Sequence, residues 1–100
     1  MAIFAITFRI HEDADYSNRY ESVVDAIKKV CHGECYWDEP TSFFLLENPH
    51  TSDAIAQWID TNSRFADNKD LLLVTNLSQK GYKAIGNVRN DCLHKLMKKR

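Results

Sequence analysis

The sequence of 100 residues predicts a single α+β domain spanning residues 1–100, in which helices pack over one apolar sheet. Two observations support this prediction. Three strongly apolar runs rich in β-branched and aromatic residues are separated by segments whose apolar residues recur every three or four positions. The composition, 44% apolar and 27% charged, is that of an ordinary globular chain large enough to bury a core.

The first strand is predicted at residues 2–10, AIFAITFRI, whose apolar residues on both faces indicate a central position in the sheet. A helix follows, because apolar side chains share one helical face: Tyr20, Val23, Val24, Ile27, Val30 and Cys31. Asp15, Ser17 or Asn18 is available to cap its start, with Asn18 and Glu21 spaced as a capping box. Gly33 is expected to end it in a left-handed conformation.

The remaining elements follow from the same patterns. Strands are predicted at residues 34–38, 41–47 and 71–75, and a short edge strand at 81–86. A second helix starts near Thr51 or Ser52, with Ile55, Trp58 and Ile59 facing the core. A last helix is outlined by Val88, Cys92, Leu93, Leu96 and Met97. The order βαββαβ, followed by a short edge strand and a helix, favours the split βαβ, or ferredoxin-like, sandwich.

Charge is distributed unevenly along the chain. Residues 1–50 hold four Lys/Arg and nine Asp/Glu, a balance of −5, whereas residues 51–100 hold nine and five, a balance of +4. Such a chain can pair with itself or meet a polyanion, and a solvated basic tail is the alternative interpretation. An odd number of cysteines, no membrane-length apolar run and no signal-peptide pattern predict a cytoplasmic protein without a membrane partner.

The stretch FRIHEDAD, residues 8–15, raises the question of a metal site. Asp13 and Asp15 follow the first strand, and clustered acids at such a place can hold Mg²⁺ in a nuclease. They lie in the connection to a helix, however, where Asp15 also suits the positive helix end. We therefore predict a polar turn with a cap, no cofactor and no catalytic residue, and keep a Mg²⁺ site at Asp13 and Asp15 as the alternative.

The stretch CHGEC, residues 31–35, contains three ligand types found in zinc sites. Structural zinc needs four ligands, and Cys31, His32 and Cys35 supply three. Cys31 also continues the apolar stripe of the preceding helix. Packed thiols are therefore predicted here, and no metal.

Basic residues gather toward the C-terminus. The predicted phosphate contacts are Lys95, Lys98, Lys99 and Arg100, with Arg9, Lys80, Lys83 and Arg89 as secondary candidates. Cations at the end of a helix also favour the negative pole of its dipole without any ligand. Both interpretations of these residues stand.

Three stretches together resemble a known family: AIFAITFRI, TSFFLLENPHTSDAIAQWI, and DLLLVTNL followed by YKAIG. They are similar to the small CRISPR-associated adaptation subunit and its SinR-like relatives. The resemblance implies compact ferredoxin-like dimers in which the segment corresponding to residues 81–86 adds to the partner's sheet. It also implies a metal-binding aspartate at the end of the first strand, where this sequence reads Phe8-Arg9-Ile10. The charge of Arg9 disfavours Mg²⁺ at that place.

The sequence thus predicts a non-catalytic homodimeric binding or scaffold protein of a nucleic-acid-processing or defence-related system. Its partners would be a second copy and either nucleic acid or another protein. One alternative is a metal-dependent endonuclease, acting on DNA or RNA, that uses Asp13, Asp15 and Mg²⁺ across the dimer interface. The other is a protein-binding regulator or inhibitor whose acidic N-terminal half imitates a polyanion.

Overall fold

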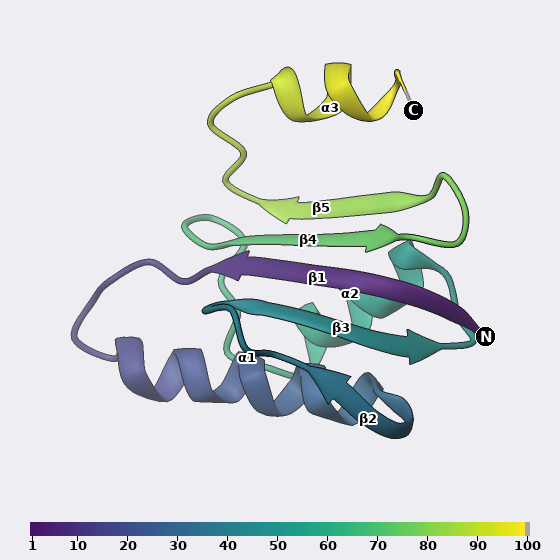
Figure 1. Cartoon of the computed structure of the whole chain (residues 1–100). Helices are drawn as coiled ribbons and strands as arrows, with labels where there is room; N and C mark the ends of the chain where they lie inside the picture. The colour runs from purple at the N-terminus through teal and green to yellow at the C-terminus, as the bar shows by residue number, and fades with distance from the viewer. Residues whose placement is uncertain (100) are drawn as a thin grey trace.

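The computed structural model describes residues 1–99, except the side chains of Glu34 and Cys35; Arg100, one predicted phosphate contact, lies outside the described residues. This part of the chain forms a small mixed α/β domain with an antiparallel sheet and three helices (Figure 1). The elements are β1 (Ala2–Arg9), α1 (Tyr16–Val30), β2 (His32–Trp37), β3 (Phe43–Asn48), α2 (Ser52–Thr61), β4 (Leu71–Asn76), β5 (Tyr82–Gly86) and α3 (Cys92–Met97).

The strands lie side by side in the order β2-β3-β1-β4-β5, and each neighbouring pair is antiparallel. The predicted central place of β1 is confirmed, since Thr7 lies opposite Phe43 of β3 and opposite Leu73 of β4. The expectation from its two apolar faces needs a correction. Phe4 and Ile6 are fully buried, whereas Ile3 on the other face is 38% exposed. Only one face of the sheet is covered.

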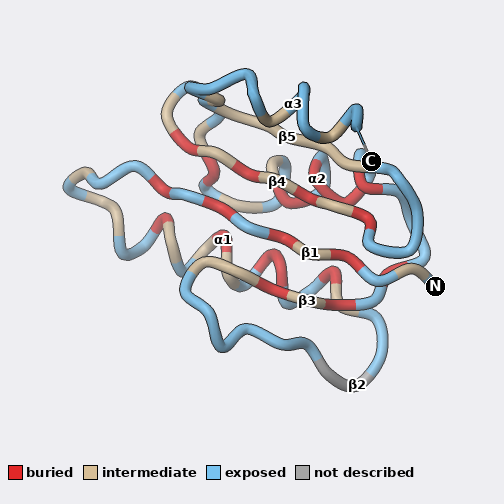
Figure 2. The backbone as a smooth tube through the Cα atoms, turned by 45° about the horizontal axis from the view of Figure 1, so that its top comes forward, coloured by how far each residue is buried: buried red, intermediate tan, exposed pale blue. Residues whose placement is uncertain are grey.

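Helices α1 and α2 cover that face and form the core with it. Val23 and Ile27 of α1 and Ile55 and Ile59 of α2 are 0–2% exposed and pack in one cluster with the inward side chains of the sheet. The apolar spacing of both helices predicted this arrangement. Figure 2 shows buried residues along β1, β3, β4, α1 and α2, while α3 and most of the connecting loops stay exposed.

The ends of α1 differ from the prediction. The helix starts at Tyr16 after the N-cap Asp15, whose side chain caps no backbone group, and Asn18 lies inside the first turn, so no capping box forms. The helix ends at Val30, and Gly33 belongs to β2 with a φ of +103°. Gly33 therefore serves the irregular β2–β3 pairing, which shifts register between His32 and Trp37. The start of α2 is as predicted, because the Thr51 hydroxyl accepts from the Ala54 N–H at 3.1 Å.

One predicted core position, Trp58, is wrong, and the last helix adds nothing to the core. Trp58 is 39% exposed, and the buried residues of α2 are Ser52, Ile55, Ala56 and Ile59. The last helix is only six residues long and buries none of them, with Leu96 63% exposed. None of the helices in residues 1–99 has the length and apolar content needed to cross a membrane.

The predicted edge strand at residues 81–86 exists and pairs with β4 of its own chain, with Leu71 opposite Gly86 and Thr75 opposite Tyr82. The implied addition of this segment to a partner's sheet is therefore not needed to complete its pairing on that side. Gly86 has a φ of +115°, and a Cβ there would lie 2.0 Å from the Asp70 carbonyl oxygen. The close approach of β5 to the start of β4 depends on this glycine.

Replacing Gly86 by Ala should lower the free energy of unfolding by roughly 2–5 kcal/mol, because both the backbone conformation and the clash penalise a side chain. Urea unfolding followed by circular dichroism measures the change. Gly81→Ala is the matched control, since its Cβ would meet the Ser52 hydroxyl at 3.4 Å, an ordinary contact. Equal stability of the two variants would contradict this account of β5.

Candidate functional site

A buried ionic cluster joins the end of β1 to α1 and to the loop before β4. The Asp70 carboxylate is fully buried and accepts hydrogen bonds from the backbone N–H groups of His11 and Ala66, both at 2.8 Å. It also pairs with the guanidinium of Arg19, which is 5% exposed. Arg19 in turn donates to the His11 carbonyl at 3.2 Å and to Asp13 at 3.0 Å. This cluster fixes the segment that contains FRIHEDAD.

Asp13 and Asp15, the predicted turn acids and alternative metal ligands, both lie against cations. Lys69 Nζ is 2.8 Å from Asp13 Oδ2, and Arg64 pairs with Asp15. The Lys69 hydrogen bond lowers the pKa of Asp13, and the Asn18 amide together with the charge of Arg64 lowers the pKa of Asp15. Among the described side chains, which leave out those of Glu34, Cys35 and Arg100, no three or more His, Cys, Asp or Glu are grouped so that they could hold a metal ion. The two carboxylates are used by the turn between β1 and α1.

Arg19 and Asp70 were not among the residues singled out from the sequence. A signal for Arg19 existed, because residues 19, 23 and 27 share one helical face and the last two are apolar. A cation on an apolar helix face indicates a buried ion pair. Its partner Asp70 could not be identified, because 51 positions separate the two residues and Asp70 only looks like part of a polar turn.

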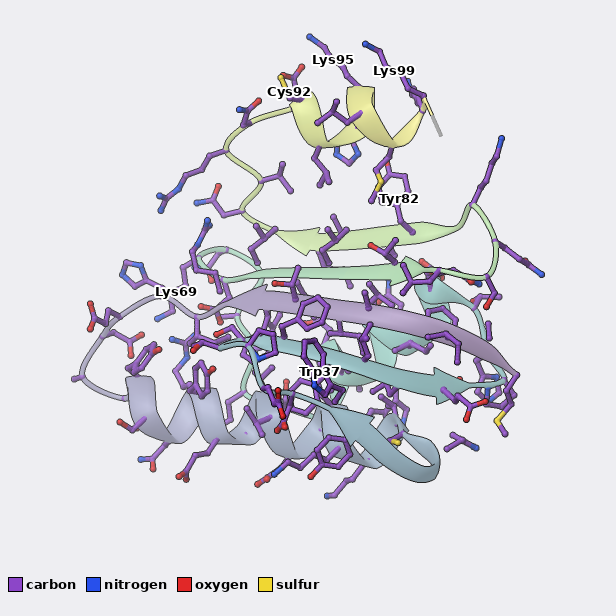
Figure 3. The ribbon with its side chains drawn as sticks, in the orientation of Figure 1. Trp37, Lys69, Tyr82, Cys92, Lys95 and Lys99 are labelled. Carbon is purple, nitrogen blue, oxygen red and sulfur yellow. The ribbon has the colours of Figure 1, made fainter. Side chains whose placement is uncertain are left out.

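The predicted phosphate contacts lie in different places. Lys95, Lys98 and Lys99 are exposed on and just after α3, and Figure 3 shows Lys95 and Lys99 pointing away from the sheet. Lys95 is 3.7 Å from Asp91, a weak surface pair. Lys83 of β5 lies 3.4 Å from Asp53 of α2 on the helix-covered side, and Lys80 lies in the exposed β4–β5 turn.

Arg9 and Arg89, the other two basic candidates, come together. Both line a groove of about 340 Å³ between the uncovered sheet face and the segment after β5. Leu71, Leu73, Val88 and Leu93 supply apolar lining, and Arg9 donates to the Asn87 carbonyl at 3.1 Å. No acidic residue lines this groove. It therefore combines an apolar surface with an unbalanced positive charge.

The uncovered face of the sheet, which we call the open face, is largely apolar but also carries Thr7, Thr75 and Glu47. It carries the outward side chains of the five strands, among them Ile3, Trp37, Phe43, Leu45 and Leu73. Trp37 is 44% exposed and meets Phe43 edge to face, with ring centroids 6.0 Å apart. Segment 88–93 and α3 lie near its β5 side, and Figure 3 shows Tyr82 on the side of β5 that faces α3. The Tyr82 hydroxyl and His94 Nδ1 are hydrogen bonded at 2.7 Å.

The sequence predicts packed thiols at Cys31 and Cys35, and Cys92 is the third cysteine of the chain. Cys31 is half-buried against the core, as its place on the α1 stripe predicted. Cys92 is exposed at the start of α3, and the side chain of Cys35 lies outside the described residues.

Comparisons with protein-family models, with curated proteins and with solved structures found no match. The resemblance to the CRISPR-associated adaptation subunit and SinR-like proteins therefore stays a prediction.

Replacing Asp70 by Asn should lower the free energy of unfolding by roughly 3–5 kcal/mol, because the buried Arg19 charge loses its fully buried partner and keeps only the half-buried Asp13. Chemical unfolding of both proteins measures the difference. Asp67→Asn, in the same loop but exposed, is the control and should change the stability by less than about 0.5 kcal/mol. A small effect of Asp70→Asn would show that water reaches Arg19.

Acid should weaken the β1–α1 turn. Because the pKa of Asp13 is lowered in the folded protein, its ionised form adds stability above the ordinary pKa of about 4, and this is lost as pH falls through the lowered value. Asp13→Asn and Lys69→Met should both flatten the loss of stability between about pH 5 and pH 2. Urea midpoints across this range test the prediction, and curves parallel to that of the unmodified protein would contradict it.

Proposed function

We propose that this chain is a non-catalytic binding protein that dimerises through its open face and scaffolds nucleic acid. Its fold would be the ferredoxin-like arrangement, with β5 and α3 as additions. Support for this comes from the strand order β2-β3-β1-β4 and from two helices packed on one side of the sheet. The setting would be cytoplasmic and nucleic-acid-processing or defence-related, as for the CRISPR-associated adaptation subunit and SinR-like proteins that it resembles.

The observation that carries the proposal is the apolar open face. Soluble monomers rarely expose a contiguous apolar patch of this kind, since its hydration is unfavourable. Ile3 and Trp37 are 38% and 44% exposed on it, and further apolar side chains connect them across the neighbouring strands. A helix of six residues is too short to cover five strands. A second copy presents an identical apolar face and can bury both.

The lysines of α3 supply the nucleic-acid contact in this proposal. Lys95, Lys98 and Lys99 are exposed, and Lys95 and Lys99 point away from the sheet (Figure 3), so phosphates can approach them while the open face is occupied. Each phosphate neutralised by a lysine releases condensed counterions, which makes binding dependent on salt and independent of sequence. A basic, flexible contact of this kind suits a scaffold.

The absence of catalysis in this proposal is supported by the ion pairs of Asp13 and Asp15. Mg²⁺ at these carboxylates would have to displace Lys69 and Arg64, and the Arg19 charge nearby would repel it. The endonuclease is therefore the weaker alternative. It requires cleavage that depends on Mg²⁺ and is lost in Asp13→Asn.

The test compares two double variants that remove the same two charges. Lys98→Ala/Lys99→Ala should weaken binding to labelled single- and double-stranded DNA and RNA, and should lower the salt slope by roughly 1.5–2. Lys28→Ala/Lys29→Ala, in the last turn of α1, should leave both unchanged. Binding is measured from 50 to 200 mM salt with and without Mg²⁺, beside sedimentation of the free protein.

The outcomes separate the three functions. Equal salt slopes in both variants would reject the α3 contact. Mg²⁺-dependent cleavage would restore the endonuclease. No affinity for any nucleic acid, together with tight binding of a protein, would favour the regulator.

A further inference from the structure

An acidic turn and a basic groove lie on opposite sides of β1. The turn follows β2 and carries Asp38 and Glu39, both exposed. Within residues 1–99, neither of these carboxylates is in an ion pair. Ser42 fixes the turn to its neighbours, since its carbonyl accepts the Phe8 N–H at 3.1 Å and its hydroxyl lies 2.8 Å from that of Tyr20. The two acids are therefore presented on an anchored loop and form no ion pair with the described part of the chain.

The groove offers complementary chemistry. Arg9 and Arg89 line it, its remaining lining is mainly apolar, and no acid is present. One nitrogen of Arg9 donates to the Asn87 carbonyl, which holds the guanidinium in place and leaves other N–H groups for a ligand. Guanidinium groups bind carboxylates with two parallel hydrogen bonds, so two arginines suit two neighbouring acids.

The turn and the groove are level along the strands. Thr7 of β1 lies opposite Phe43, where β3 begins after the acidic turn, and opposite Leu73, which lines the groove. Consider a two-fold axis that runs parallel to β1 above the open face. It keeps positions along the strands and exchanges the β2–β3 side with the β4–β5 side. The acidic turn of each copy then lies over the groove of the other.

We propose that two copies meet in this orientation, with Asp38 and Glu39 of each copy bound by Arg9 and Arg89 of the other. Trp37, next to the turn and 44% exposed, contacts the apolar lining of that groove. This inference rests on the homodimer of the proposed function and adds its symmetry axis and its charged contacts. It assigns Arg9 and Arg89 to the partner copy and leaves the α3 lysines for phosphates.

The contact occurs twice in the dimer, which allows a charge-exchange test. Arg9→Glu/Arg89→Glu and Asp38→Arg/Glu39→Arg should each weaken dimerisation roughly 100-fold or more, because like charges then meet at both contacts. Mixing the two variants should restore a dimer with one chain of each kind, since every contact again joins opposite charges. Sedimentation velocity with one chain enlarged by a tag identifies the mixed dimer, and circular dichroism confirms that each chain is folded.

Lys98→Glu/Lys99→Glu is the control. It makes the same change in net charge as the arginine variant, and the dimer should persist. If all variants dimerise as the unmodified protein does, the charged contacts are wrong while the homodimer stands. The charged contacts would also be wrong if the arginine variant and the acid variant, both folded, failed to form a mixed dimer. An unmodified protein that stays monomeric at every concentration would reject the homodimer itself. Lost nucleic-acid binding with an intact dimer would assign the arginines to phosphates instead.

Discussion

The structure depends on one buried charge, the carboxylate of Asp70. A carboxylate without water is costly unless its partners are complete. Asp70 meets this requirement with the N–H groups of His11 and Ala66 and with the Arg19 guanidinium, while its own carbonyl accepts the Asn87 N–H at 2.8 Å. The partners come from four separate segments, after β1, in α1, before β4 and after β5. Any packing that separates one of them leaves a charge or an N–H unpaired.

The same residue links the ionic cluster to the groove on the open face. The Asp70 carbonyl accepts a hydrogen bond from the Asn87 N–H, and the Asn87 carbonyl accepts one from the Arg9 guanidinium. The segment that carries Val88 and Arg89 begins at this point. The cluster therefore positions both arginines of the groove, although it lies on the helix side of β1. Asp13 has a different role. Its carboxylate pairs with Arg19 and Lys69, and without these pairs it would suit a metal ion.

Periodicity and turn residues in the sequence were enough to predict the strands, the two long helices and the start of α2, because these depend on local spacing. The prediction that Gly33 ends the first helix was wrong, because a glycine that ends a helix cannot be told from one in an irregular edge strand by sequence alone. The sequence identified the basic residues as candidate phosphate contacts, but it did not show which of them lie together. Only the fold places Arg9 beside Arg89, 80 positions later, and moves Lys83 to the opposite side.

The apolar residues on both faces of β1 predicted that both faces are buried, which is wrong for this chain, but they do mark the open face. A strand that is apolar on both faces indicates cover on both, and this chain supplies only one. Ile3, Leu45 and Leu73 on the open face are the residues that made the central strands look doubly buried. In the proposed dimer, a second copy supplies the cover for the other face. Apolar area can supply the affinity for that cover, but a two-sided apolar surface allows many orientations. In the proposed dimer, charges at the rim would select among them, because a misplaced pairing would leave an acid or an arginine unmatched.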